Sequence, residues 1–93
     1  MTKSKAKLKT KNHQPALTAV VIAKNEAEMI KSCLDTLWWC DQVLVLDSGS
    51  TDGTAEVAEK AGARVIGYAH DSMAELRSEA LKQVETEWLF YID

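Results

Sequence analysis

Four short apolar segments that alternate with helical patterns place the strongest constraint on the fold of this chain. Each segment is too short for a buried helix and is rich in aliphatic or aromatic residues, as strands inside a sheet are. Strands joined by helical crossovers run parallel, with right-handed connections. The sequence therefore predicts an α/β protein with an open, mainly parallel, Rossmann-like sheet of about four strands and helices on both faces. The expected strands are residues 17–23, 43–46, 63–67 and 87–93.

Three helices are expected between these strands. Apolar residues at helical spacing predict the first over 26–39, with Asn25 as its N-cap and a glutamate three residues on in the capping-box position. The second helix is expected to end at Gly62, because glycine is favoured just after a helix. A Ser-x-x-Glu capping box opens the third at Ser72, and this helix is predicted over 72–85.

The N-terminal segment differs from the rest of the chain in charge. Five of the 11 basic residues are lysines within residues 3–11, which leaves 6 basic against 14 acidic residues in 12–93. An acidic body is not the profile of a nucleic-acid-binding domain, so no nucleic-acid partner is expected. Residues 1–14 are predicted to be a disordered, lysine-rich tail, and 15–93 to be one folded unit. Weak contact of the tail with an anionic membrane surface is the alternative.

The lengths of the apolar runs and the spacing of the two cysteines indicate in which cellular compartment the protein is expected. The longest uninterrupted apolar run, 19–23, is far shorter than the roughly 20 residues of a membrane span, so no transmembrane segment is expected. No apolar stretch follows the N-terminal lysines as it would in a secretory signal. Cys33 and Cys40 are expected to lie on or near one helix, too far apart for a disulfide. Reduced thiols favour a cytoplasmic location.

Ligands of open parallel sheets bind outside the carboxyl ends of the strands, a rule that selects residues 24–26, 47–53 and 68–72 and Asp93. The most informative sequence there, residues 47–53, matches neither the dinucleotide-binding glycine motif nor a P-loop. It begins instead with Asp47, whose carboxylate suits hydrogen bonds to a nucleobase N–H or to ribose hydroxyls, and Gly49 permits close approach of a ligand. The alternative is an Asp-capped turn that only joins a strand to a helix.

Other residues at this edge allow two interpretations each. Asp93, at the end of the last expected strand, either helps Asp47 to form a cation or ribose site or is simply solvated. Arg77 either contacts a base or diphosphate or is a surface residue. No chemical role is expected for His70, which is isolated in the sequence. The three tryptophans, Trp38, Trp39 and Trp88, are expected to pack in the core or at its edge.

Several segments together resemble the N-terminal half of family 2 glycosyltransferases. More narrowly, they resemble the bacterial lipopolysaccharide-core beta-glucosyltransferases, because a Trp-Trp pair precedes the second strand and the run DSGSTDGT follows it. The resemblance covers about residues 17–93. It is carried by 17–26, Cys33-Leu34, 43–54, 61–65, 77–81 and 88–93, in the order and spacing of the family.

The resemblance implies a GT-A fold, of which this chain is the nucleotide-sugar-binding half. Asn25 and Glu26 match the Asn-Glu pair at the edge of the family's nucleotide pocket. Asp47 matches the acid that contacts the nucleobase or ribose, and Arg77 matches a basic position that reaches the base or diphosphate. Asp93 matches the first Asp of the D-x-D motif, which handles ribose and metal. Support for the loop is implied for Ser48, Gly49 and Asp52.

The implied activity is inverting transfer of a hexose from a nucleotide sugar, such as UDP-glucose, to a glycan or lipopolysaccharide-core acceptor of the cell envelope. The second Asp of D-x-D would fall beyond Asp93, and the catalytic base further on, so no catalytic residue is assigned within these 93 residues. The family's Mg²⁺ or Mn²⁺ is expected to be held weakly by Asp93 alone. The alternatives are a non-catalytic nucleotide-binding or interaction module and an inactive truncated fragment. A cytoplasmic location is expected, with the inner face of the membrane as the alternative.

Overall fold

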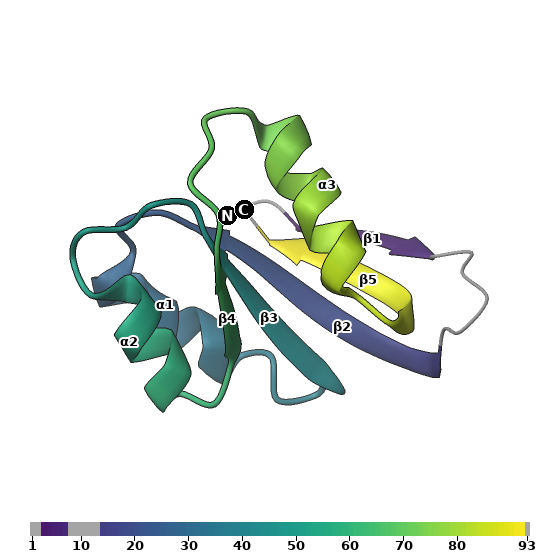
Figure 1. The fold of residues 1–93 in the computed structure, drawn as a ribbon. Coiled ribbons are helices and arrows are strands. Elements are labelled where there is room, and N and C mark those ends of the chain that lie inside the picture. The colour runs from purple at the N-terminus through teal and green to yellow at the C-terminus, as the bar shows by residue number, and fades with distance from the viewer. Residues whose placement is uncertain (1–2, 8–13, 93) are drawn as a thin grey trace.

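The computed structural model describes residues 3–7 and 14–92, which form one five-stranded sheet in the order β1-β5-β2-β3-β4 (Figure 1). The predicted α/β architecture is confirmed, because β2, β3, β4 and β5 run parallel and a helix follows each of the first three. The strands are β1 (Lys3–Lys7), β2 (Gln14–Ala23), β3 (Gln42–Asp47), β4 (Arg64–Gly67) and β5 (Thr86–Ile92). The helices are α1 (Ala27–Asp35), α2 (Thr54–Lys60) and α3 (Met73–Gln83).

Helices cover both faces of the sheet, as predicted (Figure 1). Alternate residues of the buried strand β2 point to opposite faces, so Val21 packs under α1 and α2 while Val20 packs under α3. Ile30 of α1 and Ala58 of α2 close the first layer, and Leu76 of α3 closes the second. Because β2 is buried on both sides, its sequence reads as a continuous apolar run rather than an alternation.

The strand β1 corrects the prediction that residues 1–14 are a disordered tail. Lys3–Lys7 pairs antiparallel with β5, and Gln14 already belongs to β2. The physical reason is that β5 would otherwise present unpaired N–H and C=O groups along its edge, and any backbone of extended conformation can pair with them. The prediction considered only side chains, which do not make these bonds. Residues 1–2 and 8–13 lie outside the described residues.

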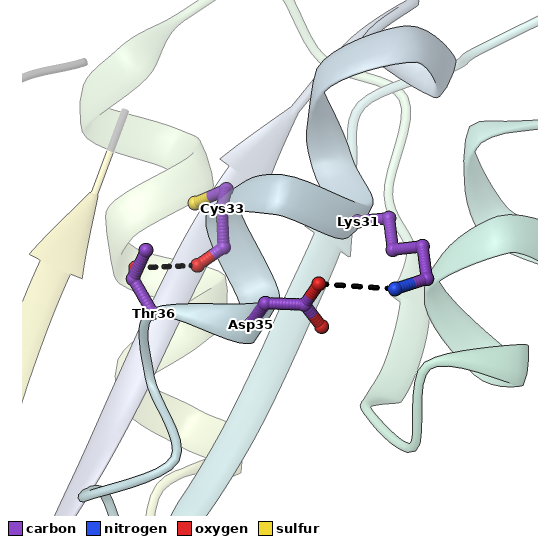
Figure 2. A network of polar contacts seen from close by, with 4 residues as sticks. All are labelled: Lys31, Cys33, Asp35 and Thr36. Carbon is purple, nitrogen blue, oxygen red and sulfur yellow. Dashed lines mark hydrogen bonds and ion pairs between the residues drawn. The ribbon is translucent and has the colours of Figure 1, made fainter.

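Helix α1 ends four residues before the predicted boundary. After Asp35 the chain tightens into turns in which the Thr36 N–H and hydroxyl both donate to the Cys33 carbonyl, at 3.1 and 2.7 Å. Figure 2 shows this contact beside the exposed ion pair of Lys31 Nζ and Asp35, 3.0 Å apart. The turns still bury Leu37, which is why the apolar periodicity continues past the end of the helix.

Two predicted helix boundaries are confirmed. Gly62 follows α2 with a φ of +94°, and its N–H donates to the Glu59 carbonyl. Ser72 caps α3 by accepting the Glu75 N–H on its hydroxyl at 3.4 Å.

The described residues contain no helix long and apolar enough to cross a bilayer.

Cys33 and Cys40 form no disulfide among the described residues, as predicted, and both are half-buried. Burial, with the nearby Asp41 carboxylate, raises the pKa of Cys40, so this thiol stays protonated and unreactive. The prediction that the tryptophans pack in the core is wrong for Trp38, which is 85% exposed. Trp39 packs edge-on against Phe90, with ring centroids 5.5 Å apart. The predicted helix over 26–39 would have carried both Trp38 and Trp39. The observed helix α1 ends at Asp35, so its apolar spacing does not determine where these two side chains lie.

Candidate functional site

The strand order creates a topological switch point between β2 and β5. From β2 the chain moves outward to β3 and β4 in one direction, and then returns through α3 to β5 on the other side of β2. Helices consequently leave opposite faces of the sheet at this point, and the carboxyl ends of the strands open into a crevice. The loops that border this edge are residues 24–26, 48–53 and 68–72.

Asp47, the last residue of β3, organises the loop that follows it. Its side chain is 9% exposed, and Oδ1 accepts the N–H groups of Gly49 at 3.2 Å and Ser50 at 2.8 Å. Gly49 has a φ of +105°, which lets the chain fold back over the carboxylate. The structure thus contains the Asp-capped turn that the sequence offered as one interpretation. No hydrogen bond engages Oδ2 among the described residues, so this oxygen can accept from a ligand.

The loop after β2 is tied to the loop after β3 by four hydrogen bonds that backbone N–H groups donate to side chains far away in sequence. The Asn25 N–H donates to Ser50 Oγ, and the Thr51 N–H donates to Asn25 Oδ1, both at 2.8 Å. Asn25 has a left-handed φ of +54°. The prediction that Asn25 caps α1 is therefore wrong, because its carboxamide oxygen accepts from the neighbouring loop. The other two bonds run from the Glu26 N–H to Thr54 Oγ1 and from the Ala27 N–H to Asp52 Oδ2.

Asp52 joins the first turns of α1 and α2. Its Oδ1 accepts from both the N–H and the hydroxyl of Thr54, while Oδ2 accepts from Ala27 at 3.1 Å. These hydrogen bonds, led by that of the Thr54 hydroxyl, lower the pKa of Asp52, so the carboxylate is ionised at neutral pH. Asp52 thus positions the two loops and is not among the residues that line a cavity at this edge.

Two adjoining cavities lie between the loops, with volumes of about 380 and 280 Å³. They share Lys24, Ser48, His70 and Asp71 as walls. Gly49 completes the larger cavity, and Glu26, Met73 and the end of β2 complete the smaller one. Of the residues singled out from the sequence, Glu26, Ser48 and Gly49 therefore line the cavities directly. Asp47 adjoins the lining residues Ser48 and Gly49 and holds their loop through Oδ1. Asn25 and Asp52 hold the walls in place.

Arg77 lies apart from these cavities in the structure. Its guanidinium stands over the Tyr91 ring, 5.4 Å from the centroid, and the Tyr91 hydroxyl donates to the Arg77 carbonyl at 3.5 Å. Burial raises the pKa of Tyr91, with a smaller opposing effect of the Arg77 charge. Arg77 thus faces β5 and does not line either cavity. Asp93 lies outside the described residues.

Three residues that line both cavities, Lys24, His70 and Asp71, received no individual role from the sequence. Their position did place them at this edge, because Lys24 directly follows β2 while His70 and Asp71 lie three and four residues beyond β4. No chemical role was expected for His70 because it is isolated in the sequence, which says nothing of the contacts that its loop makes.

A divalent cation does not fit the part of the chain that the structure describes. No three histidine, cysteine, aspartate or glutamate side chains gather there closely enough to hold an ion. Asp47 and Asp52 each use carboxylate oxygens to accept backbone N–H groups. Magnesium and manganese need several oxygen ligands at once.

Comparison with known families decides the relationship. The sequence profile of glycosyl transferase family 2 matches residues 18–93. The chain belongs to this family. The matched range begins within β2 and continues through β3, β4 and β5, so the family assignment covers all the loops that build the cavities.

Relatives of this family 2 chain include proteins that are named as glycosyltransferases. The lipopolysaccharide core biosynthesis glycosyltransferase LpsC of Rhizobium meliloti is 34% identical over 82 residues, which cover 83% of this chain and 30% of that protein. The SPbeta prophage-derived glycosyltransferase SunS of Bacillus subtilis is 30% identical over 87 residues, covering 89% of this chain and 21% of that protein. The chain thus spans less than a third of the length of these relatives.

A solved structure of similar fold contains nucleotide and metal. Glucosyl-3-phosphoglycerate synthase from Mycobacterium tuberculosis, in complex with Mn²⁺, UDP and glucosyl-3-phosphoglycerate, matches with a TM-score of 0.75 and 29% identity. The match covers 85% of this chain and 33% of that one. The same enzyme has also been crystallised with Mn²⁺, UDP-glucose and phosphoglyceric acid. The shared part is the Rossmann-like half of a GT-A fold.

Proposed function

We propose that this family 2 chain is the nucleotide-sugar-binding part of an inverting glycosyltransferase that takes a hexose from a UDP-hexose such as UDP-glucose. The observation that carries the proposal is the pair of cavities at the switch point, framed by loops whose backbones are tied to each other. The UDP and UDP-glucose bound by the M. tuberculosis enzyme support this choice of ligand. The acceptor is proposed to be a glycan or a lipopolysaccharide core, which the name of LpsC supports.

The residues divide into those that touch the nucleotide and those that position them. Asp47 Oδ2 accepts a nucleobase N–H or a ribose hydroxyl while Oδ1 keeps the loop closed. Glu26, at the wall of the smaller cavity, accepts a second hydroxyl. Asn25 holds the loop that carries Glu26. Preorganised acceptors cost less free energy on binding, because the loop is ordered before the ligand arrives.

Arg77 and Asp93 enter this proposal through their match to the family's motifs. Arg77 reaches the base or diphosphate by turning away from the Tyr91 ring, a movement that an exposed arginine on a helix makes without disturbing the core. Asp93 is proposed to contact the ribose and to supply one ligand to the Mg²⁺ or Mn²⁺ that such enzymes bind with the diphosphate. The described residues add no ligand set for that cation, so no step is assigned to it.

Transfer also requires a base that removes the proton of the acceptor hydroxyl, and stabilisation of the leaving diphosphate. We assign neither role within this chain. The expected behaviour of residues 1–93 is therefore binding of the nucleotide without turnover. We also propose a cytoplasmic location, because Cys33 and Cys40 form no disulfide in the part of the chain that the structure describes. The lysine-rich N-terminal segment is proposed to make weak contact with an anionic membrane surface.

Isothermal titration calorimetry with UDP and UDP-glucose in the presence of Mn²⁺ tests this function. Asp47→Asn keeps an oxygen at Oδ1 for the Gly49 and Ser50 N–H groups but removes the charge, so it should weaken binding about tenfold with little change in melting temperature. Asp47→Ala should weaken binding and lower the melting temperature as well. Glu59→Gln, on the exposed surface of α2, is the matched control and should bind as the wild type does.

Two results would contradict the proposal. One is the absence of measurable binding of either nucleotide to the wild-type chain. The other is an affinity that Asp47→Asn leaves unchanged. A parallel assay of sugar release from UDP-glucose separates a binding module from an enzyme, because turnover by the 93 residues would show that the missing base lies within them after all.

A further inference from the structure

We propose that His70 is a specificity-determining residue of the nucleotide site, and that its Nε2–H donates to a carbonyl oxygen of the bound nucleobase. This inference rests on the proposed function and goes beyond it by naming the residue that selects the uracil base. A base that presents a carbonyl to His70, as uracil does, is accepted. A base that presents an amino group at the same edge, as cytosine does, is rejected.

The imidazole of His70 is held at two points before any ligand binds. Its ring stacks on Tyr68 with centroids 5.7 Å apart and planes inclined by only 9°. Its Nδ1 accepts the Ser72 N–H at 3.0 Å. Tyr68 is in turn fixed to the end of β3, because its N–H donates to the Asp47 carbonyl at 2.9 Å. The ring is therefore oriented by β3 on one side and by the first turn of α3 on the other.

The bond to Ser72 decides the tautomer. A nitrogen that accepts an N–H carries no hydrogen, so in the neutral imidazole the hydrogen lies on Nε2. The described residues offer Nε2 no hydrogen-bond partner of their own. Because His70 is exposed and lines both cavities, this N–H is a fixed donor at the wall of the site.

The charges around His70 favour a neutral part of the nucleotide at this wall. The cavity walls carry two carboxylates, Glu26 and Asp71, against one ammonium group, Lys24. A diphosphate placed here would be repelled by this excess of negative charge. A nucleobase is neutral and planar, and its carbonyl oxygen is a good acceptor for a preorganised N–H. The geometry thus assigns the base rather than the diphosphate to the His70 side of the site.

Two substitutions test the roles of Nδ1 and Nε2 of His70 separately, because each replaces only one of the two nitrogens by a group of similar position. Asparagine places an oxygen near the position of Nδ1, so His70→Asn keeps the acceptor for Ser72 and loses the distal donor. Glutamine places an N–H near the position of Nε2, so His70→Gln keeps the donor and loses the local acceptor. Titration of wild type and both variants with UDP and with CDP, in Mn²⁺, measures the ratio of the two affinities.

The wild-type chain is expected to prefer UDP over CDP about tenfold or more. His70→Asn should lose most of this preference at an unchanged melting temperature, and His70→Gln should retain part of it. A ratio that His70→Asn leaves unchanged would overturn the assignment of His70 while leaving the proposed function intact. Failure of the wild type to bind either nucleotide overturns both. Loss of affinity for pyrophosphate but not for uridine in His70→Asn also overturns it, since His70 would then bind the diphosphate.

Discussion

Asn25 and Thr51, which are 26 positions apart in the sequence, are joined by a hydrogen bond of 2.8 Å from the Thr51 N–H to Asn25 Oδ1. The reciprocal bond, from the Asn25 N–H to Ser50 Oγ, has the same length. Together they connect the loops that follow β2 and β3, so the two walls of the candidate site cannot move independently. Asn25 makes these two hydrogen bonds in a left-handed backbone conformation, which asparagine tolerates better than most residues do.

Substitutions at Asn25 should separate its backbone conformation from its hydrogen bond. Asn25→Ala removes the acceptor and places a Cβ in a left-handed conformation, so it should cost about 1–2 kcal/mol of unfolding free energy. Asn25→Gly removes the acceptor only and should cost less. Urea unfolding measures both. Equal losses for the two variants would mean that backbone strain plays no part.

Asp52 should make stability depend on pH below neutrality. Its pKa in the folded chain is lowered by its hydrogen bonds, chiefly that from the Thr54 hydroxyl. The stabilisation is therefore complete above the ordinary aspartate pKa and is lost as the pH falls through the lower, folded value. Urea midpoints measured from pH 7 to pH 3 should drop less steeply in Asp52→Asn than in the wild type. Parallel curves for the two proteins would contradict this role.

Substitution by alanine should destabilise the chain at Gly62 but not at Gly67, two exposed glycines that differ in backbone conformation. Gly62 has a φ of +94°, so Gly62→Ala should destabilise the chain by about 1 kcal/mol although no atom lies within 4 Å of the new Cβ. Gly67 also has open space around it but no positive φ, so Gly67→Ala should be neutral or stabilise by about 0.5 kcal/mol. Thermal melting of the pair tests whether conformation alone makes the difference.

The buried hydroxyls of Thr18 and Thr86, 2.7 Å apart, should contribute unequally. The Thr86 hydroxyl donates its one hydrogen to the Trp88 carbonyl, so Thr18 must be the donor between the two. Thr86→Val leaves the Thr18 hydroxyl without an acceptor in the core and should cost about 1–3 kcal/mol. Thr18→Val leaves the bond to Trp88 intact and should cost less. The reverse order in urea unfolding would assign the donor to Thr86 instead.

Position at the carboxyl ends of the strands identified the site better than residue chemistry did. The rule located all three loops, and it depends only on strands that can be recognised by local apolar runs. It did not reveal that His70 would be stacked and hydrogen-bonded at the cavity wall, because these contacts depend on how the loop after β4 folds back over β3. Arg77 was expected at this edge because its helix begins there, yet its side chain lies over Tyr91.

The sequence by itself determined the parallel α/β sheet, the helices on its two faces and the family, because these follow from local apolar patterns and ordered motifs. Only the tertiary structure decided which contacts Asn25, Lys3–Lys7 and His70 make. Each is set by a partner far away in sequence or by an orientation within a loop: an N–H of another loop, the unpaired edge of β5, or the packing of one ring on another. Such contacts depend on which backbone groups remain unpaired once the sheet has formed, and no local pattern of side chains records that.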